Sequence, residues 1–188
     1  MSDSITGSDG LARCPWGHEP EIYRVYHDEE WGRPVRGDDA VFERLCLEAF
    51  QSGLSWLTIL RKRPAFHEAF AGFAIEEVAR FGEEDVERLL GDAAIVRNRA
   101  KIEASVNNAR AALELEGGLS DFVWSFRPEP GARPKSLADV PAETAESKAL
   151  AKALKKRGFR FVGPTTAYAG MQAMGLVDDH LIDCHRAG

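Results

Sequence analysis

Hydrophobic residues recur along most of this chain at spacings of three and four, the pattern of helices that bury one face. The segment that begins at Asp38, a good helix N-cap, and the segment from Arg97 to Leu115 show this pattern most clearly. We therefore expect an amphipathic helix in each segment. Their apolar stripes are formed by Phe42, Leu45, Ala49, Phe50, Gly53 and Leu54 in the first, and by Ile102, Val106, Ala109 and Leu113 in the second.

Prolines, glycines and acidic residues mark the ends of the other expected helices. Pro64 can open a short helix, because proline is favoured at the first helical position, and the acidic residues 83–85 suit the first turn of another. The prolines of residues 127–141 indicate an irregular connection. Residues 144–174 read as a helix, a glycine-bounded hairpin and a second helix, because the short alternation at 159–162 has no partner strand. The predicted fold class is all-α.

Composition sets bounds on this helical picture. The chain has 188 residues, of which 44% are hydrophobic and 29% are charged, as in ordinary soluble globular proteins. No apolar run approaches the roughly 18–20 residues that a membrane helix needs. Residues 1–11 are polar and contain neither a basic nor an apolar segment, so we expect a disordered lead-in rather than a secretion signal. Three cysteines, an odd number, argue against a disulfide framework and favour a cytoplasmic protein.

Although the net charge is −6, the basic residues are clustered in a few segments. Residues 61–63, 97–101 and 148–160 contain no acidic residue and together hold half of the 24 lysines and arginines. A local basic patch can bind DNA on an acidic protein, because only the charges that face the phosphates release counterions. Charge alone leaves a second interpretation open, in which these segments are solvated helix faces.

Two pairs of potential metal ligands lie near the ends of the chain. Cys14 and His27 follow the N-terminus closely, and His180 and Cys184 lie near the C-terminus. On a helix, the spacing of the second pair would place both side chains on one face. Two cysteines and two histidines form the closed tetrahedral shell of a structural zinc site, with no position for a catalytic water. A His-x3-Cys pair also occurs by chance, so the spacing alone leaves both interpretations open.

The helix, hairpin and helix of residues 144–174 are suited to hold a DNA phosphate. Pro164 fits the first turn of the second helix, whose exposed amides and dipole attract anions. The preceding helix supplies Lys155, Lys156 and Arg157. An ordinary helix–helix corner is the alternative, but the concentration of basic residues favours DNA.

Aromatic residues gather around one acidic residue. Trp16, Tyr26 and Trp31 crowd the N-terminal segment, and Trp56 follows Glu48 by eight residues. A single tryptophan most often fills a core, but aromatic faces also stack on nucleobases and favour cationic ones. Glu48 lies among positions that should be buried, so it is either on the wet face of its helix or in a pocket. A carboxylate in an aromatic pocket is suited to accept hydrogen bonds from a purine.

Taken together, several of these segments resemble the 3-methyladenine DNA glycosylase I family in order and spacing over about residues 12–185. This family belongs to the helix-hairpin-helix glycosylases, all-helical proteins with a DNA-binding cleft between two lobes. The matching segments are Cys14-Pro-Trp16, Tyr26-His-Asp-Glu-Glu-Trp31-Gly, Leu47-Glu-Ala-Phe-Gln-Ser-Gly-Leu-Ser-Trp56, Lys155-Lys-Arg-Gly-Phe-Arg-Phe-Val-Gly163 and Gly175-Leu-Val-Asp-Asp-His180.

The resemblance implies two lobes and one structural zinc ion. Residues 12–37 and 176–188 would form a terminal zinc-binding lobe, and residues 38–175 a helical lobe that contains the helix-hairpin-helix at about 144–174. The zinc would tie the chain ends together and do no chemistry. The ligands carried over from the family are Cys14, His27, His180 and Cys184.

The implied activity is base-excision repair, by hydrolysis of the N-glycosidic bond of 3-methyladenine in alkylated double-stranded DNA. Methylation at ring nitrogen 3 makes the adenine cationic and a good leaving group, so the enzyme must flip the nucleotide out and stabilise an oxocarbenium-like sugar. The resemblance implies that Glu48 hydrogen-bonds the base edge and that Gln51 lies near the pocket. The implied pocket walls are Trp16, Tyr26, Trp31 and Trp56, and the implied DNA-backbone contacts are Lys155, Lys156, Arg157, Gly163 and Thr165. We expect a monomer without an obligate protein partner.

Two positions depart from the patterns of related proteins. Asp178 stands where the family commonly has Asn, so we hypothesise that it occupies the catalytic Asp position of the superfamily, with a helix cap as the alternative. Thr165 stands where lyase-active members carry a lysine, which predicts a monofunctional glycosylase. A zinc hydrolase is disfavoured, because no His-Glu-x-x-His motif occurs. The remaining alternative is a zinc-stabilised DNA-binding module without activity.

Overall fold

The computed structural model describes residues 2–187 and is almost entirely helical. The all-α fold class predicted from the sequence is therefore confirmed, apart from one short two-stranded sheet. No helix within the described residues is long and apolar enough to cross a membrane. The α-helices are α1 (Glu21–Glu29), α2 (Asp38–Gln51), α3 (Trp56–Ala69), α4 (Ile75–Ala79), α5 (Glu83–Gly91), α6 (Arg99–Leu113), α7 (Gly118–Trp124), α8 (Ala145–Lys156) and α9 (Pro164–Ala173). Short 3₁₀ helices are η1 (Pro15–Gly17), η2 (Ala71–Phe73) and η3 (Leu137–Asp139).

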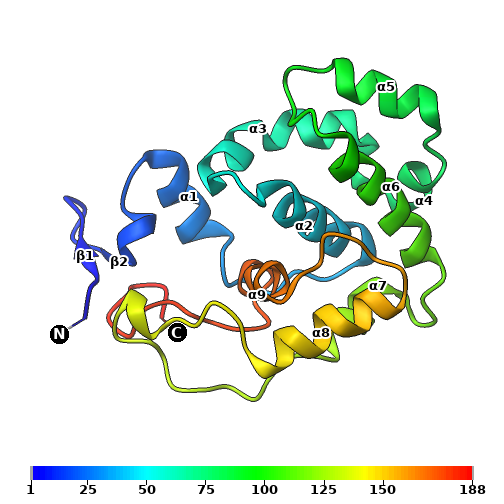
Figure 1. The fold of residues 1–188 in the computed structure, drawn as a ribbon. Helices are drawn as coiled ribbons and strands as arrows, with labels where there is room; N and C mark the ends of the chain where they lie inside the picture. The colour runs from blue at the N-terminus through cyan, green and yellow to red at the C-terminus, as the bar shows by residue number, and fades with distance from the viewer. Residues whose placement is uncertain (1, 188) are drawn as a thin grey trace.

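Helix α2 lies at the centre of the molecule, with α3, α6, α7 and α9 packed against it (Figure 1). Nearly every residue from 41 to 50 is buried, so this helix has no wide solvent-exposed face. Its continuous burial explains how an acidic side chain such as Glu48 comes to lie inside the protein. The hydrophobic core around α2 draws side chains from residues 41 to 176.

Several helix ends differ from the sequence predictions. Pro64 does not open a helix but lies inside α3, where the buried residues on both sides of it keep the helix continuous. Gly37, not Asp38, is the N-cap of α2. The Asp38 carboxylate instead accepts a hydrogen bond of 2.8 Å from the Ser120 amide in the first turn of α7, so it caps a neighbouring helix.

The N-terminal segment is more ordered than the sequence predicted for residues 1–11. Strand β1 (Ile5–Thr6) pairs antiparallel with β2 (Ala12–Arg13), with Ile5 opposite Arg13. Asp3 also accepts a hydrogen bond of 3.1 Å from the Leu137 amide. The prediction of a disordered lead-in is therefore wrong for the described residues of this segment. Backbone hydrogen bonds and a turn hold the hairpin, and the hydrophobic pattern of a sequence does not indicate such contacts.

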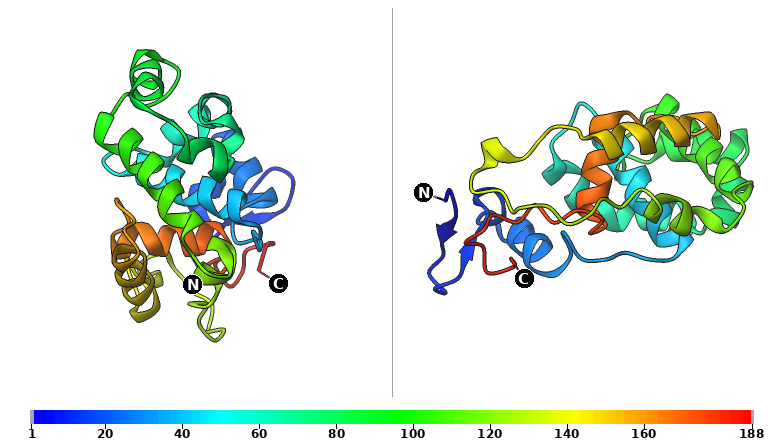
Figure 2. Two further views of the ribbon diagram at one scale, coloured as in Figure 1. Left: turned by 90° about the vertical axis from the view of Figure 1, so that its right-hand side faces the viewer. Right: turned by 90° about the horizontal axis from the view of Figure 1, so that it is seen from below.

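The first and last described segments lie at the same end of the molecule, on the left in Figure 1 and in the right panel of Figure 2. The His185 amide donates to the Ala12 carbonyl at 2.8 Å, which joins the C-terminal segment to β2. A small hydrophobic cluster of Cys14, Leu181 and Cys184 is separate from the main core and holds this junction.

Candidate functional site

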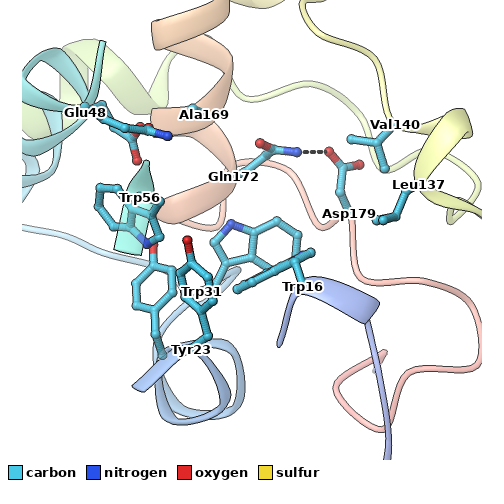
Figure 3. Close-up of a pocket in the computed structure, with 12 residues that line it drawn as sticks. Trp16, Tyr23, Trp31, Glu48, Trp56, Leu137, Val140, Ala169, Gln172 and Asp179 are labelled. Carbon is cyan, nitrogen blue, oxygen red and sulfur yellow. Dashed lines mark hydrogen bonds between the residues drawn. The ribbon is translucent and has the colours of Figure 1, made fainter. Parts of the chain in front are cut away.

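A cavity of about 400 Å³ opens between the N-terminal segment, α2, the start of α3, and α9 (Figure 3). We call it the aromatic pocket. All six residues that the sequence analysis assigned to a base pocket line it, together with six others. Its lining is Trp16, Tyr23, Tyr26, Trp31, Glu48, Gln51, Trp56, Leu137, Val140, Ala169, Gln172 and Asp179.

Short structural elements place the pocket side chains. Trp16 lies in η1 and Tyr26 in α1, while Glu48 and Gln51 lie one turn apart near the end of α2. Trp56 is the first residue of α3. The Ser55 side chain caps that helix by accepting from the Thr58 amide at 3.2 Å. A lysine of α6 supports the end of α2, where Lys101 Nζ donates to the Phe50 carbonyl at 2.9 Å.

The aromatic rings form a continuous wall on one side of the pocket, opposite Glu48, Gln172 and Asp179 (Figure 3). The ring centroids of Trp16 and Trp31 are 5.0 Å apart and nearly perpendicular. Those of Tyr26 and Trp56 are 5.4 Å apart. Rings in such contact hold one another in place and leave flat faces toward the cavity, which is suited to a planar ligand.

Glu48 is the acidic residue at the back of this pocket. Only 6% of its surface is exposed, and within residues 2–187 its carboxyl group has no hydrogen-bond partner. Burial raises the pKa of Glu48 to about 8, although the charge of Arg44 acts to lower it. A buried carboxyl without a partner is costly to a fold, so it indicates a group kept for a ligand.

The indole nitrogen of Trp56 shows the same property. Its Nε1 is buried and has no hydrogen-bond partner among the described residues. The pocket therefore offers an acceptor from α2 and a donor from α3. A flat heterocycle with both donor and acceptor edges would satisfy both groups.

The sequence analysis missed several pocket residues. Tyr23 lies one turn before Tyr26 in α1, so helical spacing would have placed it on the same face. Leu137 and Val140 come from the proline-rich connection, whose path no local pattern indicates. Gln172 Nε2 donates to Asp179 Oδ2 at 2.7 Å, and the Tyr168 hydroxyl donates to the same oxygen at 2.6 Å.

The structure does not bring Asp178 into the pocket with Glu48. Asp178 is exposed and accepts hydrogen bonds from Arg133 Nη2 at 2.6 Å and from His180 Nδ1 at 2.8 Å. Burial tends to raise its pKa, but the hydrogen bonds from His180 keep the pKa of Asp178 below its usual value. Its neighbour Asp179 lines the pocket instead, where its Oδ2 accepts from Gln172 and Tyr168.

Where the chain ends meet, the ligand atoms of Cys14, His27 and Cys184 lie together, and the ring of His180 lies beside that of His27 but outside this group; we call these four predicted metal ligands the terminal cluster. All four are buried. Cys14, His27 and Cys184 place one ligand atom each within 4.8 Å of one another, and the ring centroids of His27 and His180 are 4.9 Å apart. Residues 180–184 form no helix but a segment with turns, so the helical spacing considered for His180 and Cys184 does not apply. The turns still direct His180 and Cys184 into one cluster.

Two glycines allow the histidine rings to approach the backbone. A Cβ atom on Gly17 would lie 2.4 Å from the ring of His27. A Cβ atom on Gly32 would lie 2.8 Å from the ring of His180, and Gly32 also has a φ of +76°. The terminal cluster thus depends on residues without side chains at both positions.

The basic segments differ in whether their charges are paired with acidic residues. Arg63 pairs with Glu30 and Glu43, and Arg99 pairs with acidic residues of α5 and α6. The charges of Arg63 and Arg99 are thus neutralised within the protein and do not add to a free basic patch. Lys155 and Lys156 are exposed at the end of α8, and neither makes an ion pair within residues 2–187.

The turn between α8 and α9 is held from behind by α6. Asn108 accepts from the Arg160 amide at 2.7 Å and donates to the Arg160 carbonyl at 3.0 Å. Asn107 donates to the Gly158 carbonyl at 2.7 Å. The turn is thereby fixed beside the start of α9, where Gly163 is the N-cap and Thr165 is exposed.

The whole chain is similar to known proteins. A family model described as methyladenine glycosylase matches residues 16–187. DNA-3-methyladenine glycosylase from Haemophilus influenzae is 49% identical over 178 residues, which cover 92% of this chain and 96% of that protein.

Solved structures give the same result. A crystal structure of 3-methyladenine DNA glycosylase I, 47% identical, superimposes with a TM-score of 0.90 over 94% of this chain and all of that one. A structure of the Staphylococcus aureus 3-methyladenine DNA glycosylase I, solved for its recognition of 3-methyladenine, is 39% identical, with a TM-score of 0.89 over 94% of this chain and 96% of that one. This chain therefore belongs to the methyladenine glycosylase family.

Proposed function

We propose that this protein hydrolyses the N-glycosidic bond of 3-methyladenine in alkylated double-stranded DNA, releasing the free base and leaving an abasic site. The observation that carries the proposal is Glu48, a buried carboxyl group that has no hydrogen-bond partner among the described residues and lies in an aromatic-walled pocket. The activities named for its relatives support the same substrate.

The pocket suits a methylated adenine on three counts. The base in DNA carries a positive charge once ring nitrogen 3 is methylated, and aromatic faces attract such rings. The Glu48 carboxylate accepts a hydrogen bond from the base edge, and binding a cation favours the ionised form of Glu48. Trp56 Nε1 supplies a donor for a ring nitrogen. A neutral adenine gains less from the same groups.

The reaction needs stabilisation of charge more than proton transfer to the base. When the bond between C1′ and N9 breaks, its electron pair moves to the base, which leaves as neutral 3-methyladenine. The sugar becomes an oxocarbenium ion, to which water adds with loss of a proton. We propose Asp179, and not Asp178, as the carboxylate nearest this step, since Asp179 lines the pocket and Asp178 does not.

DNA is held, in this proposal, by the helix-hairpin-helix formed by α8, the turn and α9. The amides of Thr165 and its neighbour have no partner within the helix by their position, and α9 directs the positive end of its dipole toward them. Lys155, Lys156 and Arg157 add charge beside them, and Gly163 leaves space for a phosphate. Thr165 carries no amine and no lysine lines the pocket, which supports a monofunctional glycosylase.

The terminal cluster is proposed to bind one structural zinc ion. The donor set of two thiols and two imidazoles suits zinc. His180 Nε2 is buried and has no hydrogen-bond partner within residues 2–187, as expected of a nitrogen that binds a metal. Four protein ligands would fill the shell, so the ion would hold residues 12–37 and 176–188 together as a terminal lobe against the helical lobe, residues 38–175.

The proposal also covers the oligomeric state, the location and the partner of the protein. We propose a monomer, because base flipping and excision at one lesion use a single pocket. We also propose a cytoplasmic location, since Cys14, Cys46 and Cys184 are all buried as free thiols. Double-stranded DNA with alkylated purines is the only partner that the proposal requires.

The test is release of free 3-methyladenine from methylated DNA by the purified protein. We expect release of free base, with abasic sites formed in equal number and no strand cleavage unless a lyase is added. Tight binding to the DNA without base release would instead support the alternative of a DNA-binding module. Glu29→Gln, an exposed acid at the end of α1, is a matched control for Glu48→Gln.

A further inference from the structure

The two histidines of the terminal cluster have the same environment behind their rings. His27 Nδ1 lies 2.8 Å from Asp28 Oδ1, and His180 Nδ1 lies 2.8 Å from Asp178 Oδ1. In His27, the carboxylate occupies the nitrogen opposite the one that lies near Cys184 Sγ, and in His180 it occupies the same nitrogen, Nδ1. The two contacts come from opposite ends of the chain, so they do not follow from one local turn.

These contacts determine which ring nitrogen is free for a metal. A carboxylate accepts a hydrogen bond, so Nδ1 must carry the proton and Nε2 must carry the lone pair. His27 Nε2 lies 3.5 Å from Cys184 Sγ, and His180 Nε2 is buried without a hydrogen-bond partner. Both free nitrogens therefore belong to the buried terminal cluster.

An arginine holds each carboxylate in turn. Arg13 is 3% exposed, and its Nε and Nη2 donate to Asp28 Oδ2 at 3.0 and 2.8 Å. On the other side, Arg133 Nη2 donates to Asp178 Oδ2 at 2.6 Å. Arg13 lies in β2 and Arg133 lies in the proline-rich connection, so each pair anchors a different segment to the cluster.

We propose that Asp28 and Asp178 are matched positioning residues, each of which holds one histidine with Nε2 directed at the metal and is itself held by an arginine. The inference rests on the proposed zinc ion. It assigns Asp178 a role that is neither catalysis nor helix capping. A carboxylate behind a metal-binding histidine fixes its tautomer and ring orientation and makes its other nitrogen a stronger ligand.

His185 contacts one of the two carboxylates, Asp28, and is not itself a proposed metal ligand. Its Nε2 lies 2.9 Å from Asp28 Oδ1, and with His27 and Asp28 it forms an alternative group of potential metal ligands. That group is partly exposed and would use His27 Nδ1, whereas the terminal cluster is buried and uses Nε2. The buried cluster is therefore the metal site, and His185 orients Asp28.

The test is the zinc dissociation constant of the whole protein, measured by competition with a chromogenic chelator. Because loss of a group behind a metal ligand typically weakens binding about 10–100-fold, we expect losses in that range for Asp28→Ala and Asp178→Ala. Asp178→Asn should lose less, because its amide oxygen can still accept from His180 Nδ1. Asp183→Asn is the control, since Asp183 is exposed in the same segment and has no hydrogen bond within residues 2–187.

A spectroscopic readout separates positioning from a general loss of stability. With cobalt in place of zinc, the visible absorption of the Asp28→Ala and Asp178→Ala proteins should change from that of the parent, and that of Asp183→Asn should not. Unchanged zinc affinity and cobalt spectra in both alanine variants would overturn the inference while leaving the zinc site intact. A parent protein that binds no zinc would overturn the zinc site as well. Asp178→Asn, a conservative change at an exposed residue, keeps the test decisive if an alanine variant does not fold.

Discussion

The aromatic pocket and the terminal cluster both bury polar atoms without partners, but they surround them differently. In the terminal cluster, each histidine has one nitrogen bonded to a carboxylate and one directed inward, so the rings are fixed before any metal arrives. In the pocket, Glu48 has no hydrogen bond behind it at all within residues 2–187. A permanently bound ion is held more tightly by ligands that are already fixed. A base that binds and leaves requires instead a carboxyl group that can ionise when the base binds.

The two regions also share a wall. Trp31 lines the pocket, and its ring centroid is 4.6 Å from that of His180. Trp16 lines the pocket as well, with its centroid 5.1 Å from that of His27. The terminal cluster therefore supports two of the aromatic rings against which a base would stack.

The largest expected effect is the loss of the metal site. Cys14→Ser removes one of the four proposed zinc ligands and should lower the free energy of unfolding by about 3–5 kcal/mol. Because Trp16 and Trp31 pack on the histidines, base affinity should fall with it. Metal content and thermal unfolding measure the effect. Full zinc occupancy in the variant would remove Cys14 from the site, and Cys46→Ser, in the main core, is the control.

The next effect separates the pocket from the cluster. Glu48→Gln should lower the single-turnover rate of 3-methyladenine excision by about 100-fold, the scale of losing one charged group that stabilises the reaction. The neutral amide cannot complement a cationic base. Zinc content should be unchanged, because Glu48 has no contact with the terminal cluster. A rate within a factor of two of the parent would contradict the role of Glu48.

Glu48→Gln should increase the stability of the folded protein although it lowers the rate of excision. Glu48 has a pKa of about 8 in the folded protein against an ordinary value of 4.5, so the folded state holds a proton that the unfolded state has lost between these pH values. Stability should therefore fall as pH rises from about 4.5 to about 8. Glu48→Gln should remove this dependence and gain about 1–3 kcal/mol at pH 8. Unfolding curves across this pH range give the answer, and parallel curves for parent and variant would refute the assignment.

The smallest effect distinguishes two adjacent carboxylates. Asp179→Asn should slow excision by about tenfold, because Asp179 lines the pocket near the reacting sugar. Asp178→Asn should leave the excision rate unchanged when zinc is saturating, since Asp178 faces Arg133 and His180. The two variants differ by one position and remove the same charge, so each controls for the other. A slower rate for Asp178→Asn alone would restore the original sequence hypothesis.

The sequence predicted the residues that line the pocket more completely than it predicted the ends of the helices. Trp16, Trp31 and Glu48 line one cavity, and the resemblance of several segments to a family brought them together where no single spacing would have joined them. Helical periodicity placed the long helices, since burial of one face repeats every three to four residues.

The remaining errors have physical causes. Pro64 was expected to start a helix, but burial on both sides of it outweighs the local preference of proline. Asp178 was hypothesised to lie near the reaction, but its side chain bonds Arg133 and His180 while that of Asp179 lines the pocket. Only tertiary contacts such as those of Arg133 reveal which of the two acids faces the pocket.

The central claim is that Glu48 is kept without a partner for a methylated base. Titration of the protein with 3,9-dimethyladenine, which keeps the positive charge of the methylated base in DNA, and with neutral 9-methyladenine, followed by tryptophan fluorescence, tests it most directly, since Trp16, Trp31 and Trp56 line the pocket. We predict that the parent binds the cationic base at least about tenfold more tightly than the neutral one, and that Glu48→Gln loses most of this preference. Equal affinity for both bases, or a preference that survives in Glu48→Gln, would contradict the account.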